Sequence, residues 1–480
     1  MKTVTIALAL VGAGLVACAT NPATGRRILN ILSENEEVAI GKQSDAQIRE
    51  EMGVYGDQDW QTYVNTVGQT MAKASHRANL PWTFTVVDAS AINAFALPGG
   101  YIYVTRGILP FLRNEAELAN VLGHEIAHVT AQHGAQAYSK QVFAGVGLGV
   151  GQILLPPDKR VYAEAAGLGL GLLFLKHGRE QELEADRLGV GYAASTGWNP
   201  SGMAGMLRTL GRLSEAGGSS RGVPNFLSTH PLPADRVEAI GAIADAARTP
   251  SSTRVDADEF TRRLDGLVWG DSREQGIIRG RDFLHPILRI ALRFPDSWNI
   301  SNGATAVTAQ AEGNNEAAMV LEVAQAEGQS AAQVGRAQMA EAGFVERSAD
   351  TTSINGLPAY VGVFDGGDDT QRYTVRAAFI EAVGRVYLLA GIATPTAFPG
   401  ADATFRSAIG SFRALSQAEA DGIQPARLDF HTVRAGETWE SLARTLADGA
   451  VSADALAIMN GADPGSAPAA GTRVRVVVGG

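Results

Sequence analysis

The spacing of apolar residues changes along this chain, and it first predicts helices. Apolar residues recur at helical spacing in five segments, 33–78, 115–135, 179–195, 201–216 and 234–248. Because positions three and four apart share one face of a helix, each segment is expected to bury one side. Two short alternating runs, 81–87 and 101–105, predict strands. The first half of the chain is therefore expected to be mainly helical with a small sheet.

The pattern changes to a two-residue period at about residue 282. Alternating apolar residues predict five strands, at 290–294, 320–323, 360–364, 373–379 and 386–390. A closing helix is expected at 401–412, and the last fifty residues read as a strand, two helices and a closing strand. The sequence therefore predicts a multidomain α+β protein with two modules after the helical region.

The N-terminus has the pattern of a signal peptide. Lys2 is followed by an apolar run, Val4 to Ala17, of 14 residues, which is shorter than the roughly 20 that span a membrane. The run ends at Cys18, the only cysteine of the chain, so no intramolecular disulfide can form. The residues Leu15-Val16-Ala17-Cys18 resemble the lipobox of bacterial lipoproteins, in which the cysteine is acylated. The alternative is an ordinary secretory signal beside an incidental cysteine.

If Cys18 is acylated, its neighbours imply a location. No Asp follows Cys18, which by the same resemblance implies sorting to the outer membrane of a Gram-negative bacterium, on the periplasmic side.

The 480 residues carry 40 basic and 50 acidic side chains and no dense basic cluster. No nucleic-acid partner is therefore expected.

The five residues His124-Glu125-Ile126-Ala127-His128 indicate a metal site. Residues four apart share a helix face, so both imidazoles can reach one ion. Glu125 lies where it can polarise a water molecule, and zinc suits neutral imidazole and carboxylate ligands with one position left open. A third protein ligand is required.

Glu182 is the better candidate for that third ligand. It lies in Arg179 to Asp186, another helical segment, and Asp186 shares its face and could accept the second ring N–H of a ligand histidine. Arg179 could hold one of these carboxylates. His133 is a poor candidate, because on a continuous helix it points roughly 140° away from His128. The alternative is a charged helix face carrying ion pairs.

Three motifs occur in the order of a known family. The run Asn93-Ala94-Phe95-Ala96-Leu97-Pro98-Gly99-Gly100-Tyr101-Ile102-Tyr103-Val104, then the 124–128 motif, then 182–186, closely resembles the CaaX prenyl proteases, HtpX and the BepA-like periplasmic metallopeptidases. The resemblance covers about residues 33–243. It implies a zincin-like peptidase in which His124, His128 and Glu182 bind one Zn²⁺ and Glu125 is the general base of peptide hydrolysis.

The resemblance also assigns a substrate strand and a histidine. Asn93, Ala94, Phe95 and Ala96 form an edge strand to which an extended polypeptide substrate adds; the alternative is an ordinary buried strand. His230, in a His-Pro element of the family, could donate to the oxyanion or occupy the fourth position of zinc and keep the enzyme latent. A plain surface histidine is the third interpretation.

The remaining modules also resemble known ones. Residues 282–415 are similar in pattern to a PsbP-like domain, and 428–480 resemble a LysM module that binds peptidoglycan, or a degenerate one used for docking. The expected division is a signal peptide at 1–17, a peptidase at 18–250, a linker at 251–281, the α+β domain at 282–415, a linker at 416–427 and the βααβ module at 428–480.

Together these patterns predict a lipid-anchored zinc endopeptidase that cleaves misfolded or misassembled envelope proteins. The rivals are an inactive scaffold or chaperone and a peptidoglycan-binding lipoprotein.

Overall fold

The computed structural model describes residues 18–146, 177–216, 226–231, 234–303, 305–311, 316–326, 328–367 and 372–479. The chain divides into two compact units. Unit 1 comprises Met1–Leu267 and Leu428–Val478, and unit 2 comprises Val268–Arg427 and Gly479–Gly480. The expected signal peptide, 1–17, lies outside the described residues. Within the described ranges, no helix combines the length and the apolar character needed to cross a membrane.

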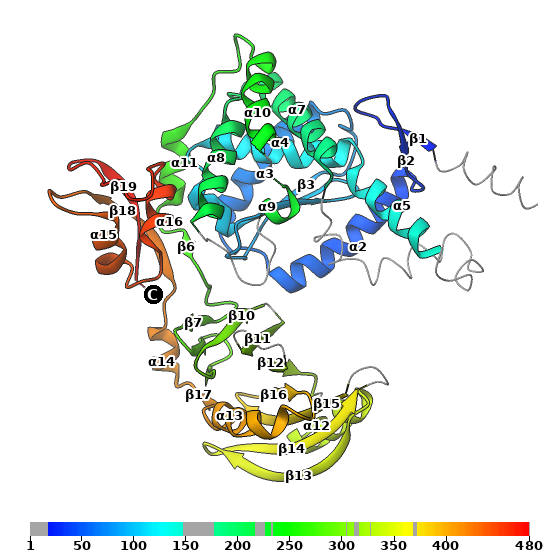
Figure 1. The fold of residues 1–480 in the computed structure, drawn as a ribbon, viewed down its shortest axis with the longest axis vertical. Coiled ribbons are helices and arrows are strands. Elements are labelled where there is room, and N and C mark those ends of the chain that lie inside the picture. The colour runs from blue at the N-terminus through cyan, green and yellow to red at the C-terminus, as the bar shows by residue number, and fades with distance from the viewer. Residues whose placement is uncertain are drawn as a thin grey trace, which may run out of the picture. The chain divides into compact units, whose positions relative to one another are not determined.

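Unit 1 is built around helix α4 (Glu115–Thr130), all of whose residues are buried (Figure 1). Asn114 caps its start, because the Asn114 side chain accepts a hydrogen bond from the backbone N–H of Glu117 at 2.9 Å. The other α-helices described in residues 18–267 of this unit are α2 (Glu34–Met52), α3 (Gln58–Lys73), α5 (His133–Val146), α7 (Arg179–Ser195), α8 (Gly202–Glu215), α9 (Phe226–Thr229), α10 (Ala234–Ala247) and α11 (Ala257–Leu264).

Helices α4 and α7 cross with their backbones in contact. A Cβ added to Gly189 would lie 2.6 Å from the backbone N of His124, and one added to Gly123 would lie 2.6 Å from the carbonyl oxygen of Gly189. Only residues without a side chain fit at such a crossing. The two glycines therefore bring the motif at 124–128 close to the acidic residues of α7.

A small sheet lies beside α4. Its strand order is β3 (Thr83–Val87), β5 (Tyr101–Thr105), β4 (Ala94–Leu97). The β3–β5 pair is parallel and the β4–β5 pair antiparallel, with Ala94 opposite Val104. Strand β4 is an edge strand of this sheet. A separate hairpin, β1 (Cys18–Thr20) with β2 (Arg27–Leu29), precedes α2.

The C-terminal segment has the predicted order of elements: strand β18 (Ala426–Thr432), helices α15 (Trp439–Leu446) and α16 (Ala453–Met459), and strand β19 (Arg473–Val478). Residues 428–478 belong to unit 1. Buried Arg475 anchors them, because its Nη1 donates to the carbonyl oxygens of Pro110 and Leu112 at 2.8 Å each. Those two residues end the 3₁₀ helix η1 (Arg106–Phe111) and lead towards α4.

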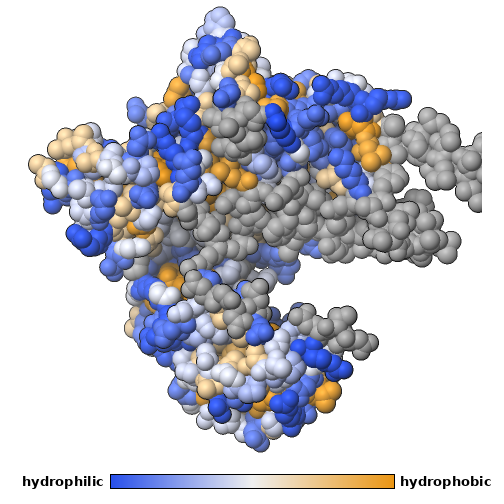
Figure 2. Space-filling model, viewed as in Figure 1, coloured by the Kyte–Doolittle hydropathy of each residue, from blue (hydrophilic) through white to orange (hydrophobic). Residues whose placement is uncertain are grey.

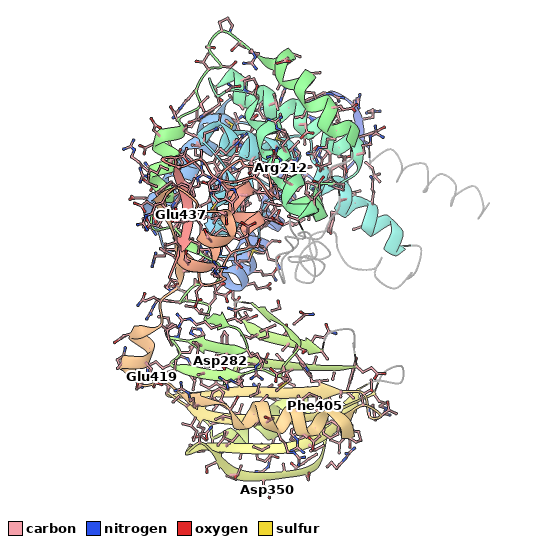
Figure 3. The ribbon with its side chains drawn as sticks, turned by 60° about the vertical axis from the view of Figure 1, so that its left-hand side comes forward. Arg212, Asp282, Asp350, Phe405, Glu419 and Glu437 are labelled. Carbon is pink, nitrogen blue, oxygen red and sulfur yellow. The ribbon has the colours of Figure 1, made fainter. Side chains whose placement is uncertain are left out.

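Unit 2 contains a seven-stranded antiparallel sheet. Its order is β10 (Trp298–Asn302), β11 (Ala306–Ala311), β12 (Ala317–Ala324), β16 (Arg385–Ala393), β15 (Arg372–Ala382), β14 (Leu357–Gly367) and β13 (Val345–Ile354). Helix α13 (Phe398–Gly410) packs Phe405, labelled in Figure 3, into one core cluster. Helix α12 (Ala331–Glu341) packs Val334 into another. Apolar residues of the sheet thus contribute to two core clusters, one packed with α13 and one with α12.

The smaller elements of unit 2 include a second sheet, in the order β17 (Arg413–Ala414), β9 (Ile290–Arg293), β8 (Asp282–His285), β7 (Ile277–Arg279). Strand β6 (Val268–Trp269) pairs with the start of β18, and α14 (Gln417–Gly422) follows β17. The segment expected as a linker at 251–281 thus contains regular structure. Figure 2 shows apolar side chains interspersed with hydrophilic ones over the visible face.

Candidate metal centre

Helix α4 places His124 and His128 side by side. Their Nε2 atoms are 3.0 Å apart, and both side chains are buried. This confirms the geometric part of the sequence argument, because residues one turn apart project from the same helix face.

Two further side chains converge on these nitrogens. Glu182 from α7 places Oε1 3.4 Å from His128 Nε2 and Oε2 3.5 Å from His124 Nε2. His230 follows α9 and places Nδ1 3.2 Å from His124 Nε2 and 3.1 Å from Glu182 Oε1. Sequence reasoning had paired Glu182 with the histidines and left the place of His230 open between three interpretations.

The four donor atoms have the spacing of a tetrahedral metal site. A tetrahedron with zinc-to-ligand bonds of 2.0–2.1 Å has edges of about 3.3–3.4 Å, and the four distances above that join His124 Nε2, His128 Nε2, His230 Nδ1 and Oε1 of Glu182 lie between 3.0 and 3.4 Å. Three imidazoles and a carboxylate are also donors that zinc accepts. His124, His128, Glu182 and His230 therefore form a group that can hold a metal ion.

Buried charges surround the group. Asp186 places Oδ1 3.0 Å from His124 Nδ1, as its position on α7 predicted. The guanidinium that faces both carboxylates is that of Arg236 on α10, which lies 2.7 Å from Glu182 Oε2 and holds Asp186 through two hydrogen bonds of 2.7 and 2.9 Å (Figure 1). Arg179, the residue expected in this role, is exposed at the start of α7. Sequence reasoning missed Arg236, because 50 residues separate it from Asp186.

These contacts set the charge of each donor. Burial raises the pKa of Glu182, but His230, His124 and His128 outweigh burial and lower it. Burial lowers the pKa of His128, which keeps this imidazole neutral. For His124 burial acts in the same direction, yet the hydrogen bonds to Asp186 and Glu182 prevail and raise its pKa to about 9. Glu182 is thus anionic and His128 neutral, as ligands of a divalent cation must be, and a cation that binds here must displace the proton that the carboxylates hold on His124.

Glu125 lies next to this group but is not one of the four donors. Its side chain is buried, and Oε1 is 3.6 Å from His230 Nε2. Burial raises the pKa of Glu125, and the facing histidines His230 and His124 oppose that rise. Its position is that of a carboxylate which can exchange a proton with a molecule bound at the donor group.

His133 departs from its expected position. The helix predicted over 115–135 ends at Thr130, and Gln132 has a φ of 57°, so α5 starts in a new direction at His133. The expectation that His133 points away from His128 assumed a continuous helix and is wrong for that reason. His133 Nδ1 lies 2.9 Å from His128 Nδ1, on the side of the ring away from the four donors.

Of the residues expected to form an edge strand, Ala94, Phe95 and Ala96 lie in β4, which begins at Ala94. Asn93 precedes it and is tied to Thr105, whose Oγ1 accepts from the Asn93 N–H at 2.9 Å. Within the described ranges β4 pairs only with β5, so its other edge is not paired with a strand. The backbone N–H of Phe226, at the start of α9, donates to the carbonyl of Ile92 at 2.9 Å. The segment carrying His230 therefore starts beside this edge.

The comparisons with known proteins agree on a peptidase. Residues 59–244 match the family model described as Peptidase family M48. Over 226 residues the chain is 32% identical to the beta-barrel assembly-enhancing protease of Escherichia coli (strain K12); the matched region covers 45% of this chain and 46% of that relative. Over 227 residues it is 30% identical to the mitochondrial metalloendopeptidase OMA1 of Schizosaccharomyces pombe; the matched region covers 46% of this chain and 64% of that relative.

The chain spans about half the length of the curated relatives it matches first. Among solved structures, the solution structure of cyanobacterial PsbP from Synechocystis sp. PCC 6803 is similar with a TM-score of 0.23 and 11% identity, covering 29% of this chain and 95% of that one.

Proposed function

Because residues 59–244 match the model of peptidase family M48, we propose that this chain is a zinc metalloendopeptidase. One observation carries the proposal: the donor atoms of His124, His128 and Glu182 converge at tetrahedral spacing beside the buried carboxylate of Glu125. A charged helix face with ordinary ion pairs would instead keep these side chains in contact with solvent.

Each of these residues has a separate role in the proposed hydrolysis. His124, His128 and Glu182 hold the ion, and Asp186 and Arg236 orient His124 and Glu182. Zinc, when bound, supplies a Lewis acid that polarises the scissile carbonyl and activates water. Glu125 accepts a proton from the attacking water on its carboxylate and returns it to the leaving amine. A peptide that extends along the edge of β4 with which no described strand pairs would bind through its main chain, which gives little sequence selectivity.

We assign His230 to a latent state. Its Nδ1 occupies the fourth corner of the donor group, which water and the substrate carbonyl need during hydrolysis. His230→Ala is therefore expected to raise basal cleavage. An oxyanion-donor role makes the opposite forecast, because loss of such a donor slows cleavage roughly a hundredfold.

The substrate class and the location are the finer part of the proposal. The relative in Escherichia coli carries the name beta-barrel assembly-enhancing protease, and the lipobox-like residues that end at Cys18 support a lipid anchor at the outer membrane. We propose misassembled outer-membrane proteins as substrates.

We assign residues 428–478 to glycan binding, which predicts that the full chain pellets with sacculi and that a chain lacking this segment does not.

The decisive experiment combines metal content with cleavage. The purified full chain should contain one zinc per chain and cleave casein, and Glu125→Gln should keep the zinc and lose cleavage. Glu180→Gln, on the exposed start of α7, is the matched control and should retain both. Stoichiometric zinc without cleavage in the wild type and in His230→Ala would instead support the scaffold or chaperone function.

A further inference from the structure

The second nitrogen of His128 has an unusual partner. His133 Nδ1 lies 2.9 Å from His128 Nδ1, and His133 Nε2 lies 3.0 Å from Glu184 Oε2. The His133 side chain is buried, and Glu184 is on α7, two residues after the donor Glu182. An imidazole thus stands between a candidate metal ligand and a carboxylate.

The chemistry of imidazole fixes the direction of these hydrogen bonds once a metal is bound. A ligand that binds through Nε2 carries its proton on Nδ1, so His128 must donate from Nδ1. His133 Nδ1 must then accept, and a neutral ring has its remaining proton on Nε2, which donates to Glu184. Only one tautomer of each ring satisfies both contacts.

Glu184 is itself held by the segment that follows Cys18. Asn21 Nδ2 lies 3.5 Å from Glu184 Oε2 and 3.3 Å from the carbonyl oxygen of Ala131, at the end of α4. Asn21 is fixed in a tight turn by the hydrogen bond from its N–H to Arg26 O at 2.8 Å. The relay therefore ends on a partly exposed carboxylate that Asn21 contacts.

The two histidines of α4 are supported in different ways. His124 meets the carboxylate of Asp186 directly, whereas His128 reaches the carboxylate of Glu184 through His133. Partners of this kind fix the tautomer and orientation of a ligand ring, and their loss typically weakens metal binding by roughly 10–100-fold.

We propose that His133 and Glu184 are positioning residues that lock His128 in the tautomer and orientation required for binding zinc. This inference rests on the proposed function, because it takes His128 as a zinc ligand. The relay lies on the far side of the His128 ring from the donor group, so it acts through His128 and not on the substrate.

The test measures zinc affinity in the purified full chain by competition with a chromogenic chelator. His133→Phe keeps a planar ring and removes both hydrogen bonds, and we expect zinc to bind roughly 10–100-fold more weakly. His133→Asn retains an oxygen near the place of Nδ1 that can accept from His128, so it should recover part of the loss. Glu184→Gln should fall between the wild type and His133→Phe, and exposed Glu180→Gln on the same helix should match the wild type.

The unfolding temperature of the metal-free protein distinguishes a residue that positions His128 from one that is needed for folding. If the relay positions His128, the metal-free unfolding temperature should change little in His133→Asn and Glu184→Gln while their zinc affinity falls. Wild-type affinity in all three relay variants would overturn the proposal. The proposal would also be overturned if His133→Phe and His133→Asn lost zinc affinity equally and both had a lower metal-free unfolding temperature. That result would indicate that His133 has a packing role.

The outcome is distinct from that of the proposed function. A wild-type chain that binds zinc through the relay but never cleaves peptide refutes the peptidase and leaves the relay standing. A chain that cleaves peptide, with relay variants that bind zinc as the wild type does, refutes the relay and leaves the peptidase standing.

Discussion

The crossing of α4 and α7 gives the sharpest test of how the fold builds the site, through the substitution Gly189→Ala. The added Cβ would lie 2.6 Å from both the carbonyl carbon of Gly123 and the backbone N of His124, where ordinary contacts begin at 3.4 Å. The helices must then separate locally by about 0.8 Å, the difference between these distances. Backbone atoms cannot rotate away as a flexible side chain can, so the strain stays at the crossing.

The separation should act on both stability and metal binding. Overpacking of this kind costs about 1–3 kcal/mol. It also moves α7, which carries Glu182 and Asp186, away from His124, whose ring is 3.5 Å from the first carboxylate and 3.0 Å from the second. We therefore expect faster amide exchange in peptides covering 115–130 and 179–195, together with weaker zinc binding.

A neighbouring glycine supplies the matched control. A Cβ at Gly191, on the same helix, meets nothing within 4 Å, so Gly191→Ala should be neutral or stabilise α7 by up to about 1 kcal/mol. Amide exchange is the suitable assay, because it reports the local opening of α4 and α7 separately from the rest of the chain. If Gly189→Ala and Gly191→Ala behave alike, close helix approach is not what assembles the site.

Three further predictions concern other parts of the molecule. Arg475→Met removes the buried guanidinium that donates to two carbonyl oxygens at 2.8 Å. It should destabilise residues 428–478 by about 2–4 kcal/mol, which faster proteolysis of that segment would show. Arg473→Met, on the exposed part of β19, is the control and should change proteolysis little. Burial, aided by Arg385, lowers the pKa of His285 from 6.5 to about 4. Protonation therefore favours the unfolded chain, so unit 2 should keep its full stability above pH 6.5 and lose about 2 kcal/mol by pH 5, measured by amide exchange in β8 and β9 and absent in His285→Gln. Chelation of zinc should lower the unfolding temperature of unit 1, and restored zinc should return it, because a ligand that binds only the folded state stabilises it; an unchanged temperature would contradict zinc binding.

Local spacing explains which parts of the site could be predicted. His124 and His128 depend only on the geometry of one helix, and Glu182 and Asp186 depend on a second periodic segment. The crossing of these helices depends on Gly123 and Gly189, whose contact is tertiary and leaves no periodic signal. For the same reason Arg236, on a third helix, was not assigned to the two carboxylates.

Helix ends limited the prediction in a second way. Apolar spacing continued to residue 135, but the chain turns at Gln132, whose positive φ redirects it before His133. A break of two residues in the helix therefore decides whether His133 points away from His128 or meets it. In unit 2 the change from helical to two-residue spacing predicted the long strands β14, β15 and β16, although both faces of the sheet bury apolar residues. Their order in the sheet depends on pairing that a single sequence does not encode locally.

Arg236 links the ligand Glu182 to the segment that carries His230. Its Nη1 lies 2.7 Å from Glu182 Oε2 and donates to the carbonyl oxygen of Pro231 at 2.9 Å, while its other nitrogens hold Asp186. The chain is therefore fixed immediately after His230 by the same side chain that orients the ligands. If His230 leaves the fourth corner during activation, the movement must arise in its own side chain or in the preceding residues 226–229, whose start is tied to Ile92 beside β4. Under the proposed function, a substrate strand that pairs with β4 would reach that tie, so substrate binding and the release of His230 would act on one short segment, while Arg236 would keep its contacts to Glu182 and Asp186.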